Sequence, residues 1–425
     1  MMKRMSISRT TSKKPIRVTA MLVTAATALA AFGAGVAEAA PRPDVVAAAK
    51  PGDPVLADVA RRVMAVGPPG YQARIGNGHR VRRTAAGLAD IGTGRRMTGR
   101  DQFEAGSNTK TFTAVLILQL VDRGQVELDA PVSTYLPGVV PDVAGVTVRM
   151  LLNHTSGLYN YTEDPDLFAD MENNPQHVHT DQELLAIAAK GESYFAPGQG
   201  WHYSNTNYVM LGMIAQKLTG KSMPTLVRER ITRPLGMKHT YYADPRAVHT
   251  GPGFAHGYGV KFAGPTPVRV DTSSWTLGWA GAAGAVISTT DDLATFFSAV
   301  LRGELFSKTQ LAQMKTTVAL PEGYPVQGGY GLGLMRLDSP CGTVWGHGGD
   351  TVGHHSSAMA TPDGRNTVTT DANAEPFDAT PNDGWDRYYR VIIAADTAAI
   401  CRMVGRPIPA AVLDDLHSVP PASGK

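Results

Sequence analysis

The chain has 425 residues, 43% of them hydrophobic and 18% charged, with a formal net charge of +3. This content is ample for a sizeable core, or for two lobes that share one, and it excludes a chain that is disordered throughout. The positive sign comes from residues 1–39, which carry six basic residues and one acid and leave a net charge of −2 for the rest. The remainder has no basic stripe with interleaved aromatic residues, so we expect no nucleic-acid binding.

Residues 1–39 have the pattern of a secretory signal peptide. Basic residues lead into an uncharged run from Val18 to Ala37, and a small-residue cleavage site ends at Ala39. A membrane anchor is the alternative, but the run is rich in Ala, Thr and Gly, and no later segment is apolar enough to span a bilayer. We therefore expect cleavage near Ala39, no stable membrane anchor, and secretion to the extracellular or cell-wall space.

Beyond the leader, the pattern predicts a sheet whose strands come from both ends of the chain. Helical spacing over 55–66 precedes a Gly-broken stretch, 71–97, that is typical of two or three strands. From Ser107 to about Gly251 the pattern is mainly helical. The helices expected there are 111–121, 148–152, 182–189, 207–218 and 225–231. A helix at 290–301 is followed by strands at 330–337, 343–345, 356–361 and 366–373 and a helix at 388–403. Residues 353–355 are expected to form a turn, and 404–425 a flexible C-terminal tail.

Ser107 and Lys110 are the most informative pair of residues. A serine hydroxyl is a poor nucleophile at neutral pH and needs a base, and a spacing of three on a helix places Lys110 beside Ser107. Because Ser107 follows Gly106 and opens a helix, its backbone N–H also suits a developing oxyanion. The alternative is that Ser107 only caps the helix while Lys110 is a solvated charge.

Two later motifs follow in an order that fits this chemistry. Tyr203 and Asn205 are two apart, which in an extended segment aims both side chains at one cleft. A phenol there can relay a proton, and an amide can hold the lysine or a substrate carbonyl. His347 precedes Gly348 and Gly349 at the end of a strand-like run, and glycines leave room for a substrate backbone at a sheet edge. Taken singly, each motif also fits an ordinary loop or turn.

The cysteines and two of the histidines raise the questions of a disulfide and of a metal site. Cys341 and Cys401 are the two cysteines of the chain, and export makes a disulfide between them the expected state, with two buried free thiols as the alternative. His177 and His179 could bind a metal, but no third-ligand motif lies nearby, so no metal is expected. The α/β-hydrolase serine elbow is missing, and so is the complete phosphate-binding loop Gly-x-x-x-x-Gly-Lys-Ser/Thr.

Serine, lysine three residues on, then Tyr-x-Asn, then a basic residue with x-Gly is the order found in the penicillin-recognising serine enzymes. From about Asp101 to Cys401 the chain resembles the secreted D-alanyl-D-alanine carboxypeptidases of the class C β-lactamase-like family. The stretches that carry this resemblance include NHTSGLYNYT, YSNTNYVMLGMIAQKLTG, AGAVISTTDDLATFFSAVL and GYGLGL.

The resemblance implies an α/β (α+β) architecture, the β-lactamase/DD-peptidase fold. An antiparallel sheet with flanking helices is then expected from 40–106 and 276–403, with a mainly helical lobe from 107–275 and the active site between the two. It implies no cofactor, and the placement of the cysteine pair matches that of the family.

Carried over residue by residue, the resemblance assigns a role to each motif. Ser107 would be the acylated nucleophile, Lys110 its base and Tyr203 the proton shuttle. The residues expected to bind substrate are Asn205, Trp279, His347, Gly348, Gly349 and Asp350. The backbone N–H groups of Ser107 and Asp350 would form the oxyanion hole.

The third motif departs from the family pattern. The carboxypeptidases commonly have His-Thr-Gly-Thr there, and the threonines, with an arginine on the preceding strand, receive the terminal carboxylate of the substrate. Here Gly348 and Asp350 replace the threonines, and Met335 stands where the arginine would be. Arg336 comes next, and alternation along a strand should point it away from the cleft. An acid at position 350 would repel a carboxylate and attract an amine.

The sequence therefore predicts a secreted serine hydrolase that acts through an acyl-enzyme, with D-alanyl-D-alanine carboxypeptidase as the leading activity. The alternatives are a D-aminopeptidase, D-amino-acid amidase or esterase, a class C-like β-lactamase, and last a non-catalytic penicillin-binding sensor. Expected partners are peptides that end in D-amino acids and β-lactams as covalent inhibitors or substrates. The protein is expected to be a monomer.

Overall fold

The computed structural model of the chain describes residues 53–78, 80–139, 143–247, 253–262, 267–377 and 382–422. The predicted signal peptide, residues 1–39, lies outside these ranges. Within them, every helix is too short or too polar to traverse a bilayer.

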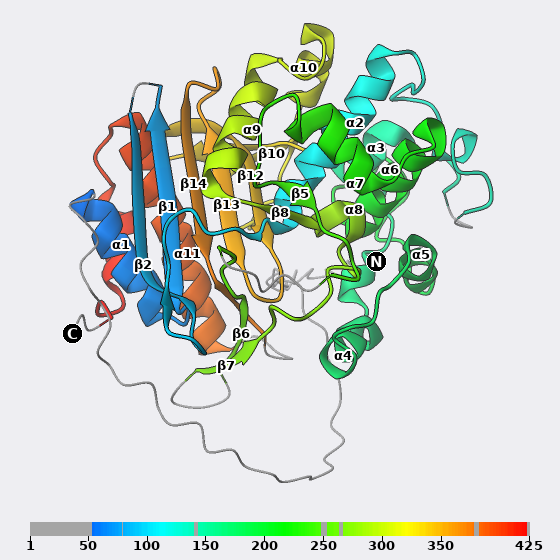
Figure 1. Cartoon of the computed structure of the whole chain (residues 1–425). Coiled ribbons are helices and arrows are strands. Elements are labelled where there is room, and N and C mark those ends of the chain that lie inside the picture. Colours follow the sequence, from blue (N-terminus) through cyan, green and yellow to red (C-terminus); the bar gives the residue numbers. More distant parts are fainter. Residues whose placement is uncertain are drawn as a thin grey trace, which may run out of the picture.

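A nine-stranded sheet runs through the molecule, and each pair of neighbouring strands in it is antiparallel (Figure 1). In spatial order its strands are β3 (Arg95–Arg96), β2 (Val81–Asp90), β1 (Gly70–Asn77), β14 (Asn366–Ala372), β13 (His355–Ala360), β12 (Gly342–Asp350), β11 (Met335–Ser339), β10 (Gly328–Tyr330) and β9 (Val318–Ala319). Strand β1 pairs with β14. The predicted sheet with strands from both ends of the chain, and the α+β fold class, are therefore confirmed.

Helices cover both faces of this sheet. One face is covered by α1 (Pro54–Ala65) and α11 (Asp383–Val404), with α12 (Ala410–His417) packed against them, and the other by α9 (Thr290–Arg302). Strand β14 is consequently buried along nearly its whole length. Helix α9 has strong local signals, because the Thr289 side chain caps its N-terminus and Gly303 ends it in a left-handed conformation at φ 70°.

The remaining helices stand on the right of Figure 1, away from β1 and β2. They are α2 (Thr109–Asp122), α3 (Val148–Asn153), α4 (Pro165–Asn173), α5 (Asp181–Ala188), α6 (Asn205–Thr219), α7 (Met223–Val227), α8 (Gly281–Gly284) and α10 (Lys308–Met314). The largest core cluster joins Phe112 and Ile117 of α2 and Leu211 of α6 with Trp345 and Ala358 of the sheet. Helix α2 is buried on nearly all sides, which explains the unbroken apolar run in its middle, residues 114–118.

Two small sheets complete the fold. One pairs β4 (Phe103–Glu104) and β5 (Tyr241–Tyr242) with the central β8 (Val286–Ser288). The other contains β15 (Ala374–Pro376), β6 (Tyr258–Lys261) and β7 (Val268–Asp271). Because β4 leads directly to Gly106 and β8 follows α8, the first small sheet holds the start of α2 beside α8.

Two expectations for the C-terminal third are wrong. The single strand expected over 330–337 is divided into β10 and β11, because Gly333 turns the chain at φ 71°. The tail expected after residue 403 contains α12, whose Leu416 is buried against α1 and α11. The turn expected at 353–355 does separate β12 from β13.

A disulfide joins Cys341, between β11 and β12, to Cys401 in α11, across a sequence separation of 60 residues. Both cysteines are buried. The bond therefore ties the strand that carries His347 to the helix that covers the sheet.

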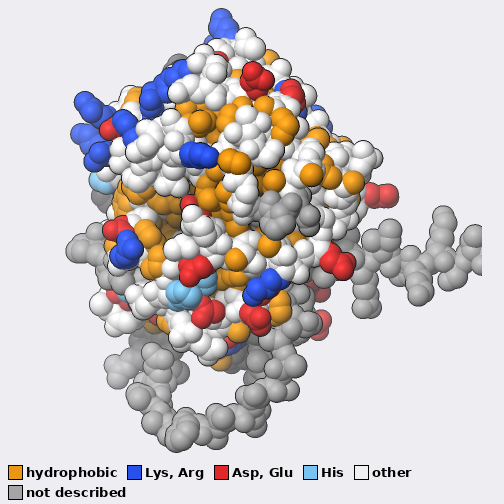
Figure 2. Space-filling view, turned by 90° about the vertical axis from the view of Figure 1, so that its right-hand side faces the viewer, with side chains coloured by type: hydrophobic (Ala, Val, Ile, Leu, Met, Phe, Trp, Pro, Cys, Tyr) orange, Lys and Arg blue, Asp and Glu red, His pale blue; other side chains and the backbone are white. Residues whose placement is uncertain are grey.

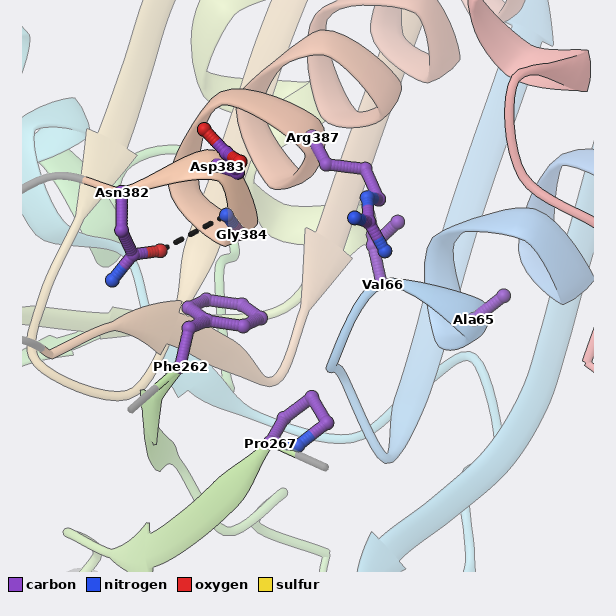
Figure 3. Close-up of a pocket in the computed structure, with 8 residues that line it drawn as sticks. All are labelled: Ala65, Val66, Phe262, Pro267, Asn382, Asp383, Gly384 and Arg387. Atoms are coloured by element: carbon purple, nitrogen blue, oxygen red, sulfur yellow. Dashed lines mark hydrogen bonds between the residues drawn. The ribbon is translucent and has the colours of Figure 1, made fainter. Parts of the chain in front are cut away.

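The surface is hollowed at more than one place. A cavity of about 660 Å³ opens between the end of α1, Phe262 and the first turn of α11, with Asn382 and Arg387 on its wall (Figure 3). None of its lining residues belongs to the group around Ser107. On the side of the molecule that Figure 2 shows, hydrophobic side chains gather in the middle of the face, and Lys and Arg side chains lie mainly toward its upper left.

Candidate active site

Ser107 and Lys110 meet at the start of α2. Gly106–Asn108 form one 3-10 turn that runs into the helix, and Gly106 has a φ of 50°, a conformation that favours glycine. The Nζ atom of Lys110 lies 3.0 Å from Oγ of Ser107. The three-residue spacing thus does place the amine beside the hydroxyl.

The surroundings of Lys110 favour a neutral amine. The side chain is fully buried, and burial lowers its pKa well below the usual range, although the Asp350 carboxylate opposes this shift. Nζ donates to Oδ1 of Asn205 at 2.6 Å and to the carbonyl oxygen of Ala283 at 3.0 Å. A neutral amine has two N–H groups and one lone pair. Since two oxygens that can only accept take both N–H groups, the lone pair is left to face the Ser107 hydroxyl.

Tyr203 is the third member of this group. Its ring centroid lies 4.7 Å from Nζ of Lys110, and its hydroxyl shares a hydrogen bond with Ser107. Burial raises the pKa of Tyr203 well above its usual range, and the hydrogen bond to Ser107 opposes that rise only in part. The phenol therefore keeps its proton and suits a proton relay better than a base.

Asn205 is the first residue of α6, and Ser204 before it is extended at φ −140° and ψ 120°. An extended residue therefore separates Tyr203 from Asn205, as the spacing of two predicts, and both side chains lie against Lys110. The Asn205 amide is itself held in place, because its Nδ2 donates to Oγ1 of Thr162 at 2.9 Å and its backbone N–H donates to Oδ1 of Asn160 at 2.9 Å.

His347 lies buried on β12, and both of its ring nitrogens are engaged. Nε2 is 2.7 Å from the hydroxyl of Tyr330, and Nδ1 is 2.5 Å from the carbonyl oxygen of Gly348. Burial, with a smaller electrostatic contribution from nearby Lys110, lowers the pKa of His347 to about 3. This histidine is a neutral, hydrogen-bonded part of the wall beside Tyr203, whose ring centroid is 6.4 Å away.

The two glycines of this motif serve different purposes. A Cβ atom on Gly349 would come within 2.0 Å of the carbonyl oxygen of Ala105 and 2.9 Å of the backbone nitrogen of Ser107. The space at Gly349 is thus taken up by the protein backbone itself, contrary to the expectation that substrate would use it. Around Gly348 a Cβ atom would meet nothing nearer than the carbonyl oxygen of Ser356 at 3.7 Å. The close approach of β12 also brings the backbone of Asp350 against Gly106.

Asp350 is anchored by His355, which the sequence predicts only as part of the turn at 353–355 and which is the first residue of β13. The Asp350 side chain is 55% exposed, and its Oδ1 lies 2.6 Å from Nδ1 of His355. Nε2 of His355 lies 3.4 Å from Asp396. Burial opposes the imidazolium form, but the carboxylates of Asp350 and Asp396 outweigh it and raise the pKa of His355 well above its usual range. Burial and the Asp350 charge raise the pKa of nearby Glu375 to about 8. At neutral pH the group therefore carries a net negative charge.

Arg336 and Trp279 stand apart from this constellation. The guanidinium of Arg336 donates to Asp338 at 3.0 Å and to Thr317 at 3.5 Å, and no hydrogen bond among the described residues joins it to Ser107, Lys110 or Tyr203. Trp279 is partly buried against the main core, and its carbonyl accepts from the Tyr161 hydroxyl at 2.8 Å. Among the described residues, no hydrogen bond or ring contact joins the Trp279 side chain to Ser107, Lys110 or Tyr203.

His154 is a site residue that the sequence analysis missed. It is fully buried, takes a left-handed conformation at φ 65°, and its ring lies 4.3 Å from that of Tyr203. Its Nδ1 accepts a hydrogen bond from the backbone of Ser204 at 3.1 Å. Burial lowers the pKa of His154 well below its usual range. The stretch NHTSGLYNYT, which contains His154, carried part of the resemblance and was the signal that could have found it.

The fold and this site define a class of protein, the serine hydrolases of the β-lactamase fold. The Beta-lactamase family model matches residues 56–390, and the chain belongs to that family, among its class C-like members.

Proteins similar to this chain in sequence include a penicillin-binding protein and an esterase. Penicillin-binding protein 4* of Bacillus subtilis is 31% identical over 68% of this chain, and the match spans 64% of that protein's own length. Esterase EstB of Burkholderia gladioli is 31% identical over 62% of this chain and 74% of its own. The family thus includes penicillin-binding proteins and an esterase at the same level of similarity.

Solved structures with the same fold include an amidohydrolase and an amidase. A D-stereospecific amidohydrolase from a Streptomyces species has 36% identity and a TM-score of 0.71, over 81% of this chain and 98% of its own. The D-amino acid amidase of Ochrobactrum anthropi SV3, complexed with L-phenylalanine, has 27% identity and a TM-score of 0.68 over 81% and 98%.

Proposed function

We propose that this protein hydrolyses amides and short peptides of D-amino acids whose reacting residue carries a free amino group, through an acyl-enzyme on Ser107. The observation that carries this proposal is the half-exposed carboxylate of Asp350, which His355 holds in a group of net negative charge and which acts electrostatically on Lys110. A carboxylate there attracts an ammonium group and repels a terminal carboxylate.

In the proposed reaction, neutral Lys110 takes the proton of Ser107 Oγ as that oxygen bonds to the substrate carbonyl carbon. The backbone N–H groups of Ser107 and Asp350 stabilise the oxyanion. The Tyr203 hydroxyl passes the proton from Lys110 to the leaving nitrogen, and the amine departs. Water then attacks the ester, gives up a proton along the same route, and releases the free acid and Ser107.

The comparisons support the same substrate class. The Streptomyces amidohydrolase is D-stereospecific and the Ochrobactrum enzyme is a D-amino acid amidase, and both align over almost their whole length. Arg336 supports it in a different way, because its guanidinium is paired with Asp338.

D-alanyl-D-alanine carboxypeptidase is the second candidate. The penicillin-binding relative from Bacillus subtilis favours it, as does the resemblance of the motifs other than the third. Both candidates share the acylation step, so both predict that a labelled penicillin or a fluorophosphonate reacts with Ser107 and that Ser107→Ala abolishes the label.

The deciding experiment compares three substrates: D-phenylalanine amide, its N-acetylated form, and a peptide ending in D-Ala-D-Ala. We expect cleavage of the free-amine amide, poor cleavage of the other two, and a loss of at least about 1,000-fold in kcat/KM for Ser107→Ala. At a pH where Lys110 is neutral in both proteins, Asp350→Asn should lower kcat/KM about tenfold or more on the free-amine amide alone, since a hydrogen bond to a charged group contributes roughly 1.5–3 kcal/mol.

Asp415→Asn, an exposed change on α12, is the matched control and should change neither value. Release of terminal D-alanine from the peptide without cleavage of the amide would replace this proposal by the carboxypeptidase. Equal losses in Asp350→Asn on the amide and on its N-acetylated form would refute the role of the amine.

We also infer export of the protein, because a basic leader with a cleavage site precedes a domain with a buried disulfide. Mass spectrometry of the protein from the culture medium should find a chain that begins near Ala40. An intact leader in the cytosolic fraction alone would contradict this inference.

A further inference from the structure

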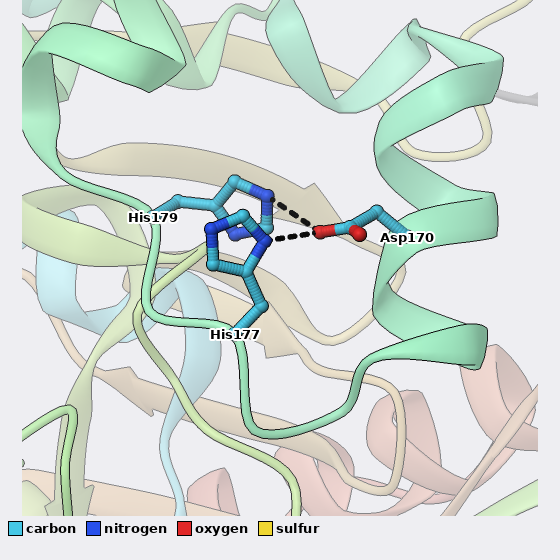
Figure 4. A group of neighbouring side chains, drawn as sticks. All are labelled: Asp170, His177 and His179. Carbon is cyan, nitrogen blue, oxygen red and sulfur yellow. Dashed lines mark hydrogen bonds and ion pairs between the residues drawn. The ribbon is translucent and has the colours of Figure 1, made fainter.

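A histidine pair far from Ser107 in the sequence converges on one carboxylate. Asp170 lies on α4, and His177 and His179 lie in the segment between α4 and α5 (Figure 4). Oδ2 of Asp170 is 2.5 Å from Nδ1 of His177 and 3.1 Å from Nε2 of His179. The three candidate ligand atoms all lie within 4.8 Å of one another. No third-ligand motif lies beside the two histidines in the sequence, and the fold supplies the third ligand.

We propose that Asp170, His177 and His179 bind a divalent transition-metal ion of the zinc type. Two imidazoles and a carboxylate form a donor set that suits zinc, with bonds of about 2.0–2.2 Å. Such bonds place neighbouring ligand atoms roughly 3.3 Å apart in a tetrahedral site, so a small outward movement of His177 makes room for the ion. The three ligands leave one position for water.

The surroundings orient the donors as a metal site requires. Oδ1 of Asp170 accepts a hydrogen bond from Nδ2 of Asn174 at 2.7 Å, which turns Oδ2 toward the histidines. The His179 side chain is 5% exposed, whereas that of His177 is 44% exposed and leaves a way in from solvent.

The ion would also stiffen one wall of the candidate active site. A Cβ atom on Gly278 would lie 3.0 Å from Cα of Val178 and 3.2 Å from the backbone nitrogen of His179, so the histidine segment packs directly on the loop before Trp279. The backbone N–H of Thr276 donates to the carbonyl oxygen of Pro175 at 2.8 Å. That loop leads into α8, whose Ala283 carbonyl accepts from Lys110. The metal would therefore tie α4 to the segment that positions the base.

The test uses the purified chain after removal of any affinity tag and treatment with a chelator. Titration with zinc by calorimetry, and with cobalt by visible absorption, should show one ion per chain and the absorption bands of cobalt bound to imidazole nitrogen. Zinc should raise the melting temperature, because it binds the folded state. His177→Ala and Asp170→Asn should each weaken binding at least about tenfold, since even changes around metal ligands cost 10–100-fold.

His239→Ala, which removes an exposed histidine outside the cluster, is the matched control and should bind zinc as the wild type does. Because His177 is exposed, its replacement by alanine should leave the metal-free melting temperature unchanged. Wild-type protein that takes up no zinc at millimolar concentration would overturn the proposal. So would His177→Ala and Asp170→Asn variants that bind as tightly as the wild type. These readouts do not depend on hydrolysis, so they stand apart from the test of the proposed substrate.

Discussion

At the scale of single residues, the proposed chemistry depends on one proton at Lys110. The two carbonyl acceptors, on Asn205 and Ala283, direct its N–H groups away from Ser107, and burial favours the neutral form. Asp350 works against this, since a nearby negative charge favours the ammonium form. The residue proposed to select the substrate therefore also sets the pH at which the base becomes active.

Asp350→Asn should move the acidic limb of acylation to lower pH. Removing the carboxylate removes the interaction that raises the pKa of Lys110, so the amine becomes neutral at a lower pH. The measurement is the rate at which a fluorophosphonate labels Ser107 as a function of pH, since this reagent has no amine for Asp350 to bind. A limb that moves to higher pH, or does not move, would contradict the coupling of Asp350 to Lys110.

The glycines after His347 offer a second residue-scale prediction. Gly349→Ala should destabilise the protein by about 1–3 kcal/mol and displace Ser107, because its Cβ atom would collide with backbone atoms of Ala105 and Ser107. Gly348→Ala should leave the stability unchanged, because its Cβ atom would meet only ordinary contacts. Urea denaturation of the two variants measures the difference, and equal stabilities would show that β12 does not press against the start of α2 as described.

At the scale of elements, the disulfide between Cys341 and Cys401 links β11 and β12 to α11 over a loop of 60 residues. A crosslink over such a loop typically contributes about 2–4 kcal/mol. Replacing both cysteines by serine should lower the free energy of unfolding by that amount, as measured by urea denaturation without reductant. The loss should match that of the wild type under reducing conditions, and a double variant as stable as the oxidised wild type would refute the contribution.

The small sheet of β4, β8 and β5 is the element that assembles the site. It places the 3-10 turn of Ser107 next to α8, so a nucleophile from residue 107 and a carbonyl from residue 283 reach the same lysine. Strand β12 closes the other side, where Gly349 allows backbone to pack on backbone. The site is therefore held by three elements that are remote from one another in the chain.

At the scale of the whole molecule, we expect a monomer. The nine-stranded sheet ends in β3 and β9, each two residues long, which leaves few unpaired backbone groups for edge-to-edge association. The large hydrophobic side chains exposed among the described residues, Val81, Tyr241 and Val268, lie on three different strands. Light scattering on a size-exclusion column should give the mass of one chain at all concentrations, and a mass that rises with concentration would contradict this.

The order of strands and helices, and the Ser107–Lys110 pair, could be predicted from the sequence because both are local. The periodicity predicts a helix, and in a helix residues three or four positions apart lie on the same face. The strand patterns near the N-terminus and the C-terminus predict one sheet that contains strands from both. The fold family followed from motifs that span most of the chain. The missing threonines after His347 and the acid at position 350 could also be read from the sequence, as a departure from the carboxypeptidase pattern.

Other features were decided by the tertiary structure, because they depend on segments far apart in the chain. Nothing near Lys110 in the sequence indicates that Ala283 accepts its N–H, that His355 anchors Asp350, or that β12 leaves no room for a side chain at Gly349. Packing against α1 and α11 made a helix of residues 410–417, where composition suggested a loose tail. Local patterns report the periodicity of one element, whereas close approach, burial and shared hydrogen bonds arise when elements meet.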